Sequence, residues 1–294
     1  MLTIFTVPRE FAGDFAAIQR TALESWLALR PAPEVILLGD DGGTAEAARE
    51  HGVEHVPRIA RNELGTPLLD NVFEQARWLA TNKLLCFLNA DIVLLEDFSA
   101  AVARVAVLPE PFLMIGECRN LDPALAAAEL RSGRLAEVAR ARGRSRGAKA
   151  IDYFVFSRDL YGSVPPFVLG RTRYDNWLVW RARDLGATVV DATPVVTAVH
   201  QDHHYAFVPG KPREAAWVQD SDEARRNHEL TGGSRQLCFV WDATHRLTRR
   251  GLRRNPRSWF RVRNRVEELR GKVLWRARWL RDAARALQRR RDRS

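Results

Sequence analysis

The segment at residues 83–97, KLLCFLNADIVLLED, constrains the fold more than any other part of the sequence. Residues 84–88 are continuously apolar, which is typical of a strand buried on both faces of a parallel sheet. The run stops at Asn89-Ala90-Asp91, and apolar character resumes directly afterwards. Asn89 and Asp91 are two positions apart, so in extended backbone both side chains leave the same face.

This polar triplet marks a candidate site, because open α/β sheets bind their ligands at the carboxyl ends of their strands. Two oxygen ligands that project together suit a hard divalent cation that also holds phosphate. A polar turn that only ends the strand is the alternative. On these three residues alone, both interpretations stay open.

Strand-like and helix-like patterns alternate along the first part of the chain. Strands are predicted at residues 2–7, 35–38, 53–56, 84–88 and 111–116, and helices at 15–29, 44–50, 67–80 and 97–107. Such alternation with short connections predicts an α/β fold, with a mostly parallel central sheet and helices on both faces. Neither a dinucleotide-binding glycine fingerprint nor a P-loop follows the first strand.

The second part of the chain continues with less regular patterns. An Ala/Leu/Arg-rich segment predicts a helix at residues 122–142, and GRSRG at 143–147 predicts a flexible basic loop. A strand at 151–156, a helix at 178–185 and an extended stretch at 189–199 follow.

Length and composition fit a globular protein. The 294 residues, 46% of them hydrophobic, suffice for one large α/β domain with an extension or for two small domains. The opening LTIFTV lacks a basic leader, and no apolar run approaches the roughly 20 residues of a spanning helix. The three cysteines show neither disulfide nor metal spacing. We therefore expect a protein of the reducing cytoplasm.

The net charge of +10 belongs to one end of the chain. Residues 244–294 hold 19 of the 46 Lys and Arg residues and 4 of the 36 Asp and Glu residues. Their balance of +15 leaves −5 for residues 1–243. A partner inferred from charge is therefore a partner of the C-terminal segment.

Residues 259–294 have the pattern of an amphipathic helix. Apolar residues recur three or four positions apart, and tryptophans lie among many arginines. This pattern is typical of a helix at a membrane interface, so we expect peripheral contact with an anionic membrane surface at the inner face of the cell membrane. A charged helix that docks on another protein surface is the alternative. RNA binding is a third and least favoured possibility, open because arginine alone neutralises phosphate without specifying the polymer.

Four polar positions along the chain are candidates for chemistry: Asp40, the pair Asn89 and Asp91, Asp175, and His200. Each has a structural alternative, such as a turn residue, a helix-terminal acid or a solvated loop. Three of the four follow predicted strands, where one crevice can gather them. Their joint occurrence favours a site.

Several strings around these positions resemble one protein family. They are TIFTVPREF near the start, GRTRYDNWLVWRA with the following ATVVDATPVVTAVHQDHHY, and LCFVWDATHRL near residue 240. Together they resemble the GT-A glycosyltransferases, in particular family 2-like nucleotide-sugar transferases of bacteria and plants. The resemblance covers residues 1–247 and implies a GT-A domain there. Residues 248–294 are then a basic amphipathic helical tail.

The resemblance implies a metal-assisted site. The family's Asp-x-Asp motif falls on Asn89-Ala90-Asp91, so Asp91 would be the carboxylate on Mn²⁺ or Mg²⁺, and His200 would complete the metal site. Asn89 departs from the usual acid and removes one charge. A neutral amide oxygen can still ligate a metal or bond sugar hydroxyls.

The resemblance also assigns the remaining roles. Asp175 corresponds to the general base, and the neighbouring Arg171 and Arg173 are expected to keep it ionised and to meet phosphate. Trp177 would present an apolar face to a sugar or pack in the core. His203 and His204 receive no role, and Asp152 and Asp242 are either structural or on the acceptor side. Positions that meet the donor nucleotide sugar are Thr6, Pro8, Asp40, Asn62, Asn71, Asn89, Ala90 and Asp91.

The expected function is that of an inverting glycosyltransferase in polysaccharide biosynthesis. It would move a sugar from a nucleotide-diphosphate donor to a hydroxyl of a glycan or lipid-linked acceptor. A non-catalytic sugar-nucleotide or glycan-binding protein is the main alternative, motivated by Asn89. A sugar-1-phosphate nucleotidyltransferase is less favoured, because the glycine-rich loop that holds its nucleoside triphosphate is missing.

Overall fold

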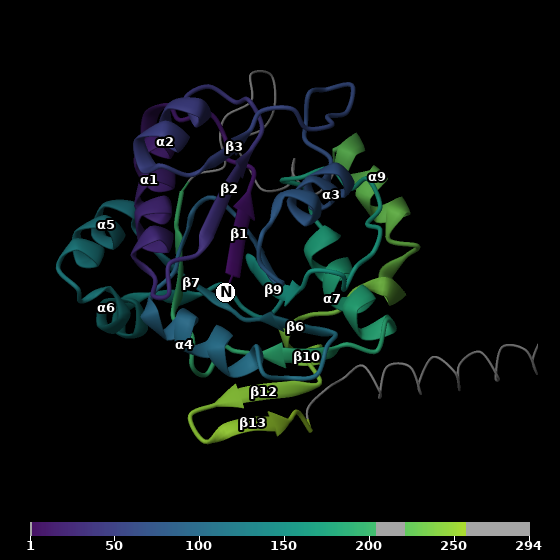
Figure 1. Ribbon diagram of the computed structural model, residues 1–294. Coiled ribbons are helices and arrows are strands. Elements are labelled where there is room, and N and C mark those ends of the chain that lie inside the picture. The colour runs from purple at the N-terminus through teal and green to yellow at the C-terminus, as the bar shows by residue number, and fades with distance from the viewer. Residues whose placement is uncertain (1, 204–220, 257–294) are drawn as a thin grey trace, which may run out of the picture. The chain divides into compact units, whose positions relative to one another are not determined.

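The computed structural model describes residues 2–203 and 221–256 (Figure 1). The chain divides into a unit that runs from Met1 to Asn255 and a second unit, Pro256–Ser294. The predictions for His204 and for the amphipathic segment at 259–294 lie outside the described residues.

A nine-stranded sheet forms the centre of the first unit, in the order β13-β12-β10-β6-β9-β4-β1-β2-β3. Two of its strands, β9 and β13, run antiparallel to their neighbours, and the other ladders are parallel. The predicted α/β fold with a mostly parallel sheet is confirmed. The strands are β1 (Leu2–Thr6), β2 (Glu34–Leu38), β3 (Glu54–Val56), β4 (Leu84–Leu88), β6 (Phe112–Ile115), β9 (Tyr153–Ser157), β10 (Thr188–Asp191), β12 (His245–Thr248) and β13 (Gly251–Arg254).

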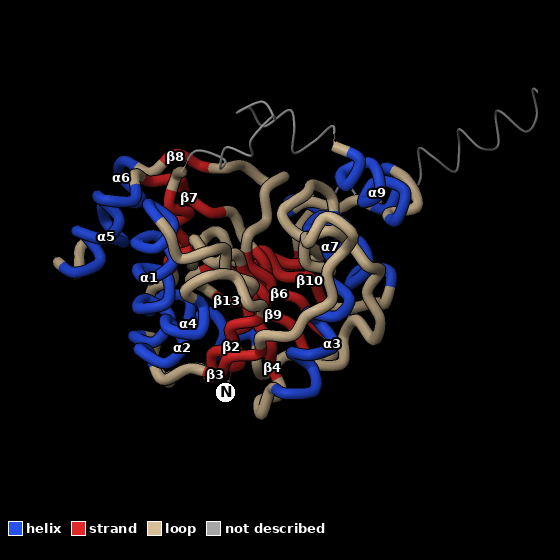
Figure 2. The backbone as a smooth tube through the Cα atoms, turned by 90° about the horizontal axis from the view of Figure 1, so that it is seen from above, coloured by secondary structure: helices blue, strands red, loops and turns tan. Residues whose placement is uncertain are grey.

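Helices cover both faces of the sheet. In two perpendicular views, α1, α2 and α4 lie on one side, and α3 and α7 lie on the other (Figures 1 and 2). The helices are α1 (Gly13–Ala28), α2 (Thr44–His51), α3 (Leu69–Leu79), α4 (Glu96–Val105), α5 (Pro123–Arg131), α6 (Leu135–Arg142), α7 (Tyr174–Asp184) and α9 (Asp222–Leu230).

Strand β4 lies in the middle of this arrangement and is buried along its whole length. Its alternate residues Leu84, Cys86 and Leu88 belong to a core cluster with residues of α1 and α4. Phe87 points to the opposite face, where its ring lies 5.3 Å from that of Phe73 in α3. The apolar run at 84–88 is therefore a strand buried on both faces, as predicted.

A second, four-stranded sheet follows the end of β4. It has the order β5-β11-β7-β8 and consists of β5 (Ile92–Val93), β11 (Ala198–Gln201), β7 (Cys118–Leu121) and β8 (Arg144–Ser145). β11 pairs antiparallel with β5 and parallel with β7. This sheet brings the residues after β4 next to residues more than one hundred positions later in the chain.

Three local predictions are wrong in detail. The predicted helix at 122–142 is two helices, because Gly133 adopts a left-handed φ of 74° between them. The predicted loop at 143–147 contributes strand β8, which pairs with β7. The extended stretch at 189–199 is split between β10 and β11, with a turn between them in which the amides of Val195 and Val196 bond to the carbonyl of Ala192.

The C-terminal end of the first unit is a β-hairpin. β12 pairs parallel with β10 and antiparallel with β13. The domain boundary predicted at residue 247 falls inside β12, and residues 251–254, predicted as helical tail, form β13. Within the described ranges, no helix combines the length and the apolar character needed to cross a membrane.

The buried indole of Trp26 in α1 fixes the segment that follows β4. Its Nε1 donates to the carbonyl oxygen of Ile92 at 2.8 Å, and the neighbouring Ser25 Oγ accepts from the amide of Leu94 at 3.1 Å. Helix α1 thereby holds both ends of β5.

We expect Trp26→Phe to lower the free energy of unfolding by about 2–4 kcal/mol, because it leaves a cavity and an unpaired buried carbonyl. Urea unfolding measures this loss. Trp78→Phe is the matched control, since Trp78 is 79% exposed, and its effect should stay within about 0.5 kcal/mol. Equal effects of the two substitutions would contradict the anchoring role of Trp26.

Candidate functional site

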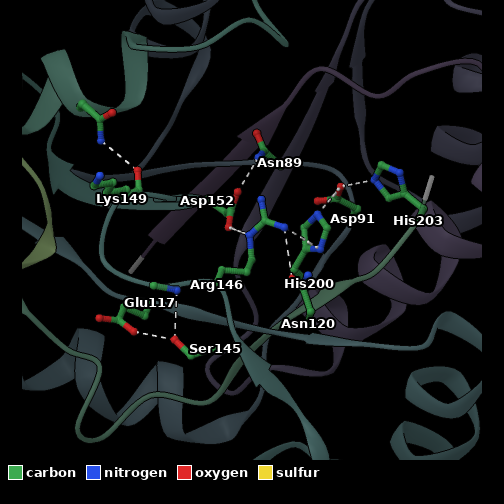
Figure 3. A network of polar contacts seen from close by, with 12 residues as sticks. Asn89, Asp91, Glu117, Asn120, Ser145, Arg146, Lys149, Asp152, His200 and His203 are labelled. Carbon is green, nitrogen blue, oxygen red and sulfur yellow. Dashed lines mark hydrogen bonds and ion pairs between the residues drawn. The ribbon is translucent and has the colours of Figure 1, made fainter. Parts of the chain in front are cut away.

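Three potential metal ligands gather where β4 ends (Figure 3). Asp91 Oδ2 lies 2.9 Å from His203 Nε2 and 3.3 Å from His200 Nε2. One ligand atom from each residue lies within 4.8 Å of the others. The structure therefore brings the predicted residues Asp91 and His200 together and adds His203.

The ladder between β5 and β11 explains this proximity. His200 is the register partner of Ile92, the residue directly after Asp91. The backbone amide of the buried Gln201 donates to the Asp91 carbonyl at 3.3 Å, and its side-chain nitrogen does so at 3.2 Å. These two bonds hold the backbone of Asp91 against β11, the strand that also carries His200.

Asp91 is ionised, and only one of its two carboxylate oxygens is hydrogen-bonded among the described residues. Burial acts to raise the pKa of Asp91, but the hydrogen bonds with His200 and His203 outweigh it and hold the pKa well below its usual value. The second carboxylate oxygen, Oδ1, is buried and has no hydrogen-bond partner among the described residues. Buried polar atoms are normally paired, so this oxygen is available to a cation.

The geometry of the three residues fits a divalent cation. An octahedral ion with ligands at about 2.0–2.1 Å places neighbouring ligand atoms about 3 Å apart. The two separations from Asp91 Oδ2, 2.9 and 3.3 Å, are close to this spacing, and all three ligand atoms lie within 4.8 Å of one another. Imidazole and carboxylate together suit ions such as Mn²⁺ better than Ca²⁺, which prefers oxygen ligands alone.

His203 is a site residue that the sequence prediction missed. Its ring packs edge-on against Phe15 of α1, with 4.8 Å between the ring centroids. The only signal in the sequence was its position three residues after His200, at the end of an extended stretch, and that spacing also suits a solvated loop.

Arg9 was also missed and lies near the same residues. Its guanidinium carbon lies 4.5 Å from the centroid of the Phe15 ring, and Gln19 bonds both its backbone amide and its carbonyl, at 2.7 and 3.0 Å. Burial lowers the pKa of Arg9, and the attraction of Asp91 opposes it as the next largest influence. Arg9 thus adds positive charge within electrostatic reach of Asp91.

Asn89 is bonded to Asp152, the residue directly before β9 (Figure 3). Its Nδ2 donates to Asp152 Oδ1 at 3.0 Å. Asp152 Oδ2 forms an ion pair with Arg146 Nε at 2.9 Å, and Arg146 Nη1 lies 3.1 Å from His200 Nδ1. A continuous polar chain therefore connects Asn89 with His200.

Asp175 lies in the first turn of α7. The residue before this helix, Arg173, has a φ of 88° and is the sole non-glycine residue with positive φ in the part of the chain that the structure describes. Such strain is common next to functional residues.

Burial raises the pKa of Asp175 to about 7, against the backbone hydrogen bonds of Asn176 and Ile151, and the charge of Asp152 adds to the rise. Neither Arg171 nor Arg173 is among the main influences on this pKa. Arg171 is engaged by the buried Glu223 instead, with Nη2 and Oε2 2.6 Å apart. A carboxyl group that titrates near neutral pH suits a general base.

The residues predicted to meet the nucleoside lie at the ends of β1 and β2. Thr6 is buried, and its Oγ1 donates to the carbonyl of Leu88 at 2.7 Å, which joins the ends of β1 and β4. Pro8, two positions after Thr6, is also buried. Asp40 is exposed and pairs with Arg61, which also binds Asp41 at 2.6 Å.

Asn62 and Asn71 brace the loop between β3 and α3. Asn62 Oδ1 accepts the amides of Leu64 and Thr66 at 3.0 and 2.8 Å, and its Nδ2 donates to Glu223 at 2.6 Å. Asn71 Oδ1 accepts the amide of Ala60 at 2.8 Å. Both side chains therefore stabilise the loop between β3 and α3, and their predicted contact with the donor stays a prediction.

Two further residues have structural roles. Trp177 is buried, and its ring packs 5.2 Å from that of Phe167, which favours the core position over a sugar contact. Asp242 is buried too, and its Oδ2 accepts the amide of Phe239 at 3.0 Å, which fixes a short turn. Ala90 is half-buried between Asn89 and Asp91.

Comparisons with known proteins agree with this architecture. No protein-family model and no curated protein sequence matches the chain. Among solved structures, it is similar to GalNAc-T7 with UDP, GalNAc and Mn²⁺, with a TM-score of 0.50 and 13% identity. That match covers 79% of this chain and 48% of the other, so this chain spans about half of that protein.

A second similar structure is glucosyl-3-phosphoglycerate synthase from Mycobacterium tuberculosis, in complex with Mn²⁺, UDP-glucose and phosphoglyceric acid. Its TM-score is 0.49 at 15% identity, and the match covers 79% of this chain and 80% of that one. Identities this low show the fold alone. The chain has the GT-A fold.

We expect the chain to bind one Mn²⁺ at Asp91, His200 and His203. His203→Ala should weaken binding by at least about 10-fold, because the loss even of outer-shell partners costs about 10–100-fold. His51→Ala is the control, since His51 ends α2 and contacts the carbonyl of Ala47. Isothermal titration with Mn²⁺ measures both variants, and equal affinities would exclude His203 as a ligand.

Proposed function

We propose that this chain is a glycosyltransferase that moves a sugar from a nucleotide-diphosphate donor to an acceptor hydroxyl, with inversion at the anomeric carbon. The observation that carries the proposal is the cluster of Asp91, His200 and His203 at the carboxyl end of the central strand of a GT-A fold. GalNAc-T7, one of the proteins of similar structure, has UDP and Mn²⁺ in its structure.

The cluster supports the donor side of the reaction. Asp91, His200 and His203 would hold Mn²⁺ or Mg²⁺, which when bound neutralises charge on the departing diphosphate. Arg9 lies within electrostatic reach of Asp91 and can add to this neutralisation without a second metal. Asp40 would meet the nucleoside, and the loop braced by Asn62 and Asn71 would contact the donor.

Asp175 supports the acceptor side. The acceptor oxygen forms a bond to the anomeric carbon, and its proton passes to a carboxylate oxygen of Asp175. The bond from that carbon to the diphosphate oxygen breaks, and its electron pair stays on the diphosphate. A single displacement of this kind needs one base and no nucleophilic carboxylate of the enzyme.

We expect Asp175→Asn to lower kcat by about 10²- to 10⁴-fold, the usual contribution of a general base. Donor affinity should change little. The variant should be at least as stable as the unmodified chain at pH 8, because it removes a carboxylate whose ionisation burial opposes. Asp184→Asn on the same helix, where Asp184 pairs with Arg181, is the matched control. Full activity of Asp175→Asn would remove the base assignment.

The pH profile follows from the same carboxyl group. Asp175 acts as a base only when it is deprotonated, and its pKa in the folded chain is about 7. The value of kcat/KM should therefore rise about tenfold per pH unit below pH 7 and level off above it. A flat profile between pH 5.5 and 8 would contradict this role.

A panel of nucleotide sugars tests the function itself. Thermal shifts are recorded with UDP-, GDP- and dTDP-sugars, each with and without Mn²⁺, since a ligand of the folded state raises its melting temperature. We expect one nucleotide class to stabilise the chain, and more strongly with Mn²⁺. Donor binding without transfer or donor hydrolysis would favour the non-catalytic binding protein instead.

A contact of residues 259–294 with membranes stays a prediction.

A further inference from the structure

Asp152 is a buried acid that the proposed reaction does not use. It is 5% exposed and lies directly before β9. Its carbonyl oxygen accepts the backbone amide of Asn89 at 3.1 Å, and its Oδ1 accepts the side-chain amide of the same residue at 3.0 Å. Two hydrogen bonds therefore fix Asn89 against Asp152.

The geometry points to a positioning role: Asp152, held by Arg146, orients Asn89 so that its amide oxygen accepts a hydrogen bond from a donor hydroxyl. This inference rests on the proposed function. Asn89 has one amide nitrogen and one amide oxygen, and a carboxylate can only accept hydrogen bonds. The nitrogen must then face Asp152, and the oxygen points away from it (Figure 3).

Arg146 joins this pair to the metal-ligand cluster. Its Nε lies 2.9 Å from Asp152 Oδ2, and its Nη1 lies 3.1 Å from His200 Nδ1 and donates to Asn120 Oδ1 at 3.1 Å. The guanidinium presents its donors in a rigid planar fork, so one side chain sets the relative position of Asp152 and His200. The side chain of Asn89 and the predicted metal ligand His200 thereby contact the same polar network.

The arrangement explains why an amide stands at position 89. A carboxylate there would bring an oxygen to within about 3 Å of Asp152 Oδ1, and like charges at that distance repel strongly. An amide and an acid form a complementary pair instead. Exchanging the two residues should restore a hydrogen bond of reversed direction.

A double-mutant cycle tests the pair without any ligand. Asn89→Asp should lower the Tm at pH 8 by at least about 5 °C, and the double variant N89D/D152N should recover at least about half of that loss. The matched control is Asp191, whose Oδ2 also lies 2.9 Å from an arginine Nε, that of Arg246. N89D combined with D191N should show additive losses.

Donor kinetics test the positioning role. In Asp152→Asn the amide of Asn89 is no longer forced into one orientation, so KM for the nucleotide sugar should rise about 3- to 10-fold. Mn²⁺ affinity, measured with the metal alone, should stay within about twofold, because the three ligands are unchanged and Arg146 keeps its contacts with His200 and Asn120. Asp191→Asn should leave KM unchanged. A purely structural role of Asp152 would lower the Tm and leave KM as it is.

The outcomes separate the two proposals. If the unmodified chain neither binds nor turns over any nucleotide sugar, the proposed function fails, and the donor contact of Asn89 fails with it. If the chain is active but the Tm losses of N89D and D152N are additive and KM is unchanged in D152N, only the positioning role is overturned.

Discussion

The antiparallel pairing of β5 with β11 is the interaction on which the site depends. β5 has only two residues, yet this ladder places His200 beside the residue that follows Asp91. Two buried side chains support it, because Trp26 bonds the carbonyl of Ile92 and Gln201 bonds that of Asp91. Without this ladder, Asp91 would lie in an ordinary polar turn after β4, with no histidine held beside it.

The large-scale architecture was predictable from the sequence because it follows from local patterns. The continuous apolar run at 84–88 identified the central strand with its correct bounds. The second sheet was not predictable in the same way, since strands of two to four residues carry little periodic signal. Its consequence, the position of Arg146 inside a polar network rather than in a flexible loop, was therefore missed as well.

The site could be predicted only as far as residue type indicates chemistry. Asp91 and His200 were identified from their places at strand ends, and the structure brings them together. The protonation state of Asp175 could not be predicted from its neighbours in the sequence, because burial dominates its pKa and Arg171 is paired with Glu223. From the sequence, Asn89 was interpreted as a weakened metal ligand. Its hydrogen bond to Asp152 was not predictable, because Asp152 lies 63 positions later in the chain.

Anomalous diffraction at the manganese edge, from crystals soaked with Mn²⁺ and a nucleoside diphosphate, tests most directly whether Asp91, His200 and His203 bind the metal. We expect one strong peak between a carboxylate oxygen of Asp91 and ring nitrogens of His200 and His203, with phosphate density next to it. A chain that binds both ligands with the peak elsewhere, or with Asp91 still bonded only to the two histidines, would contradict it.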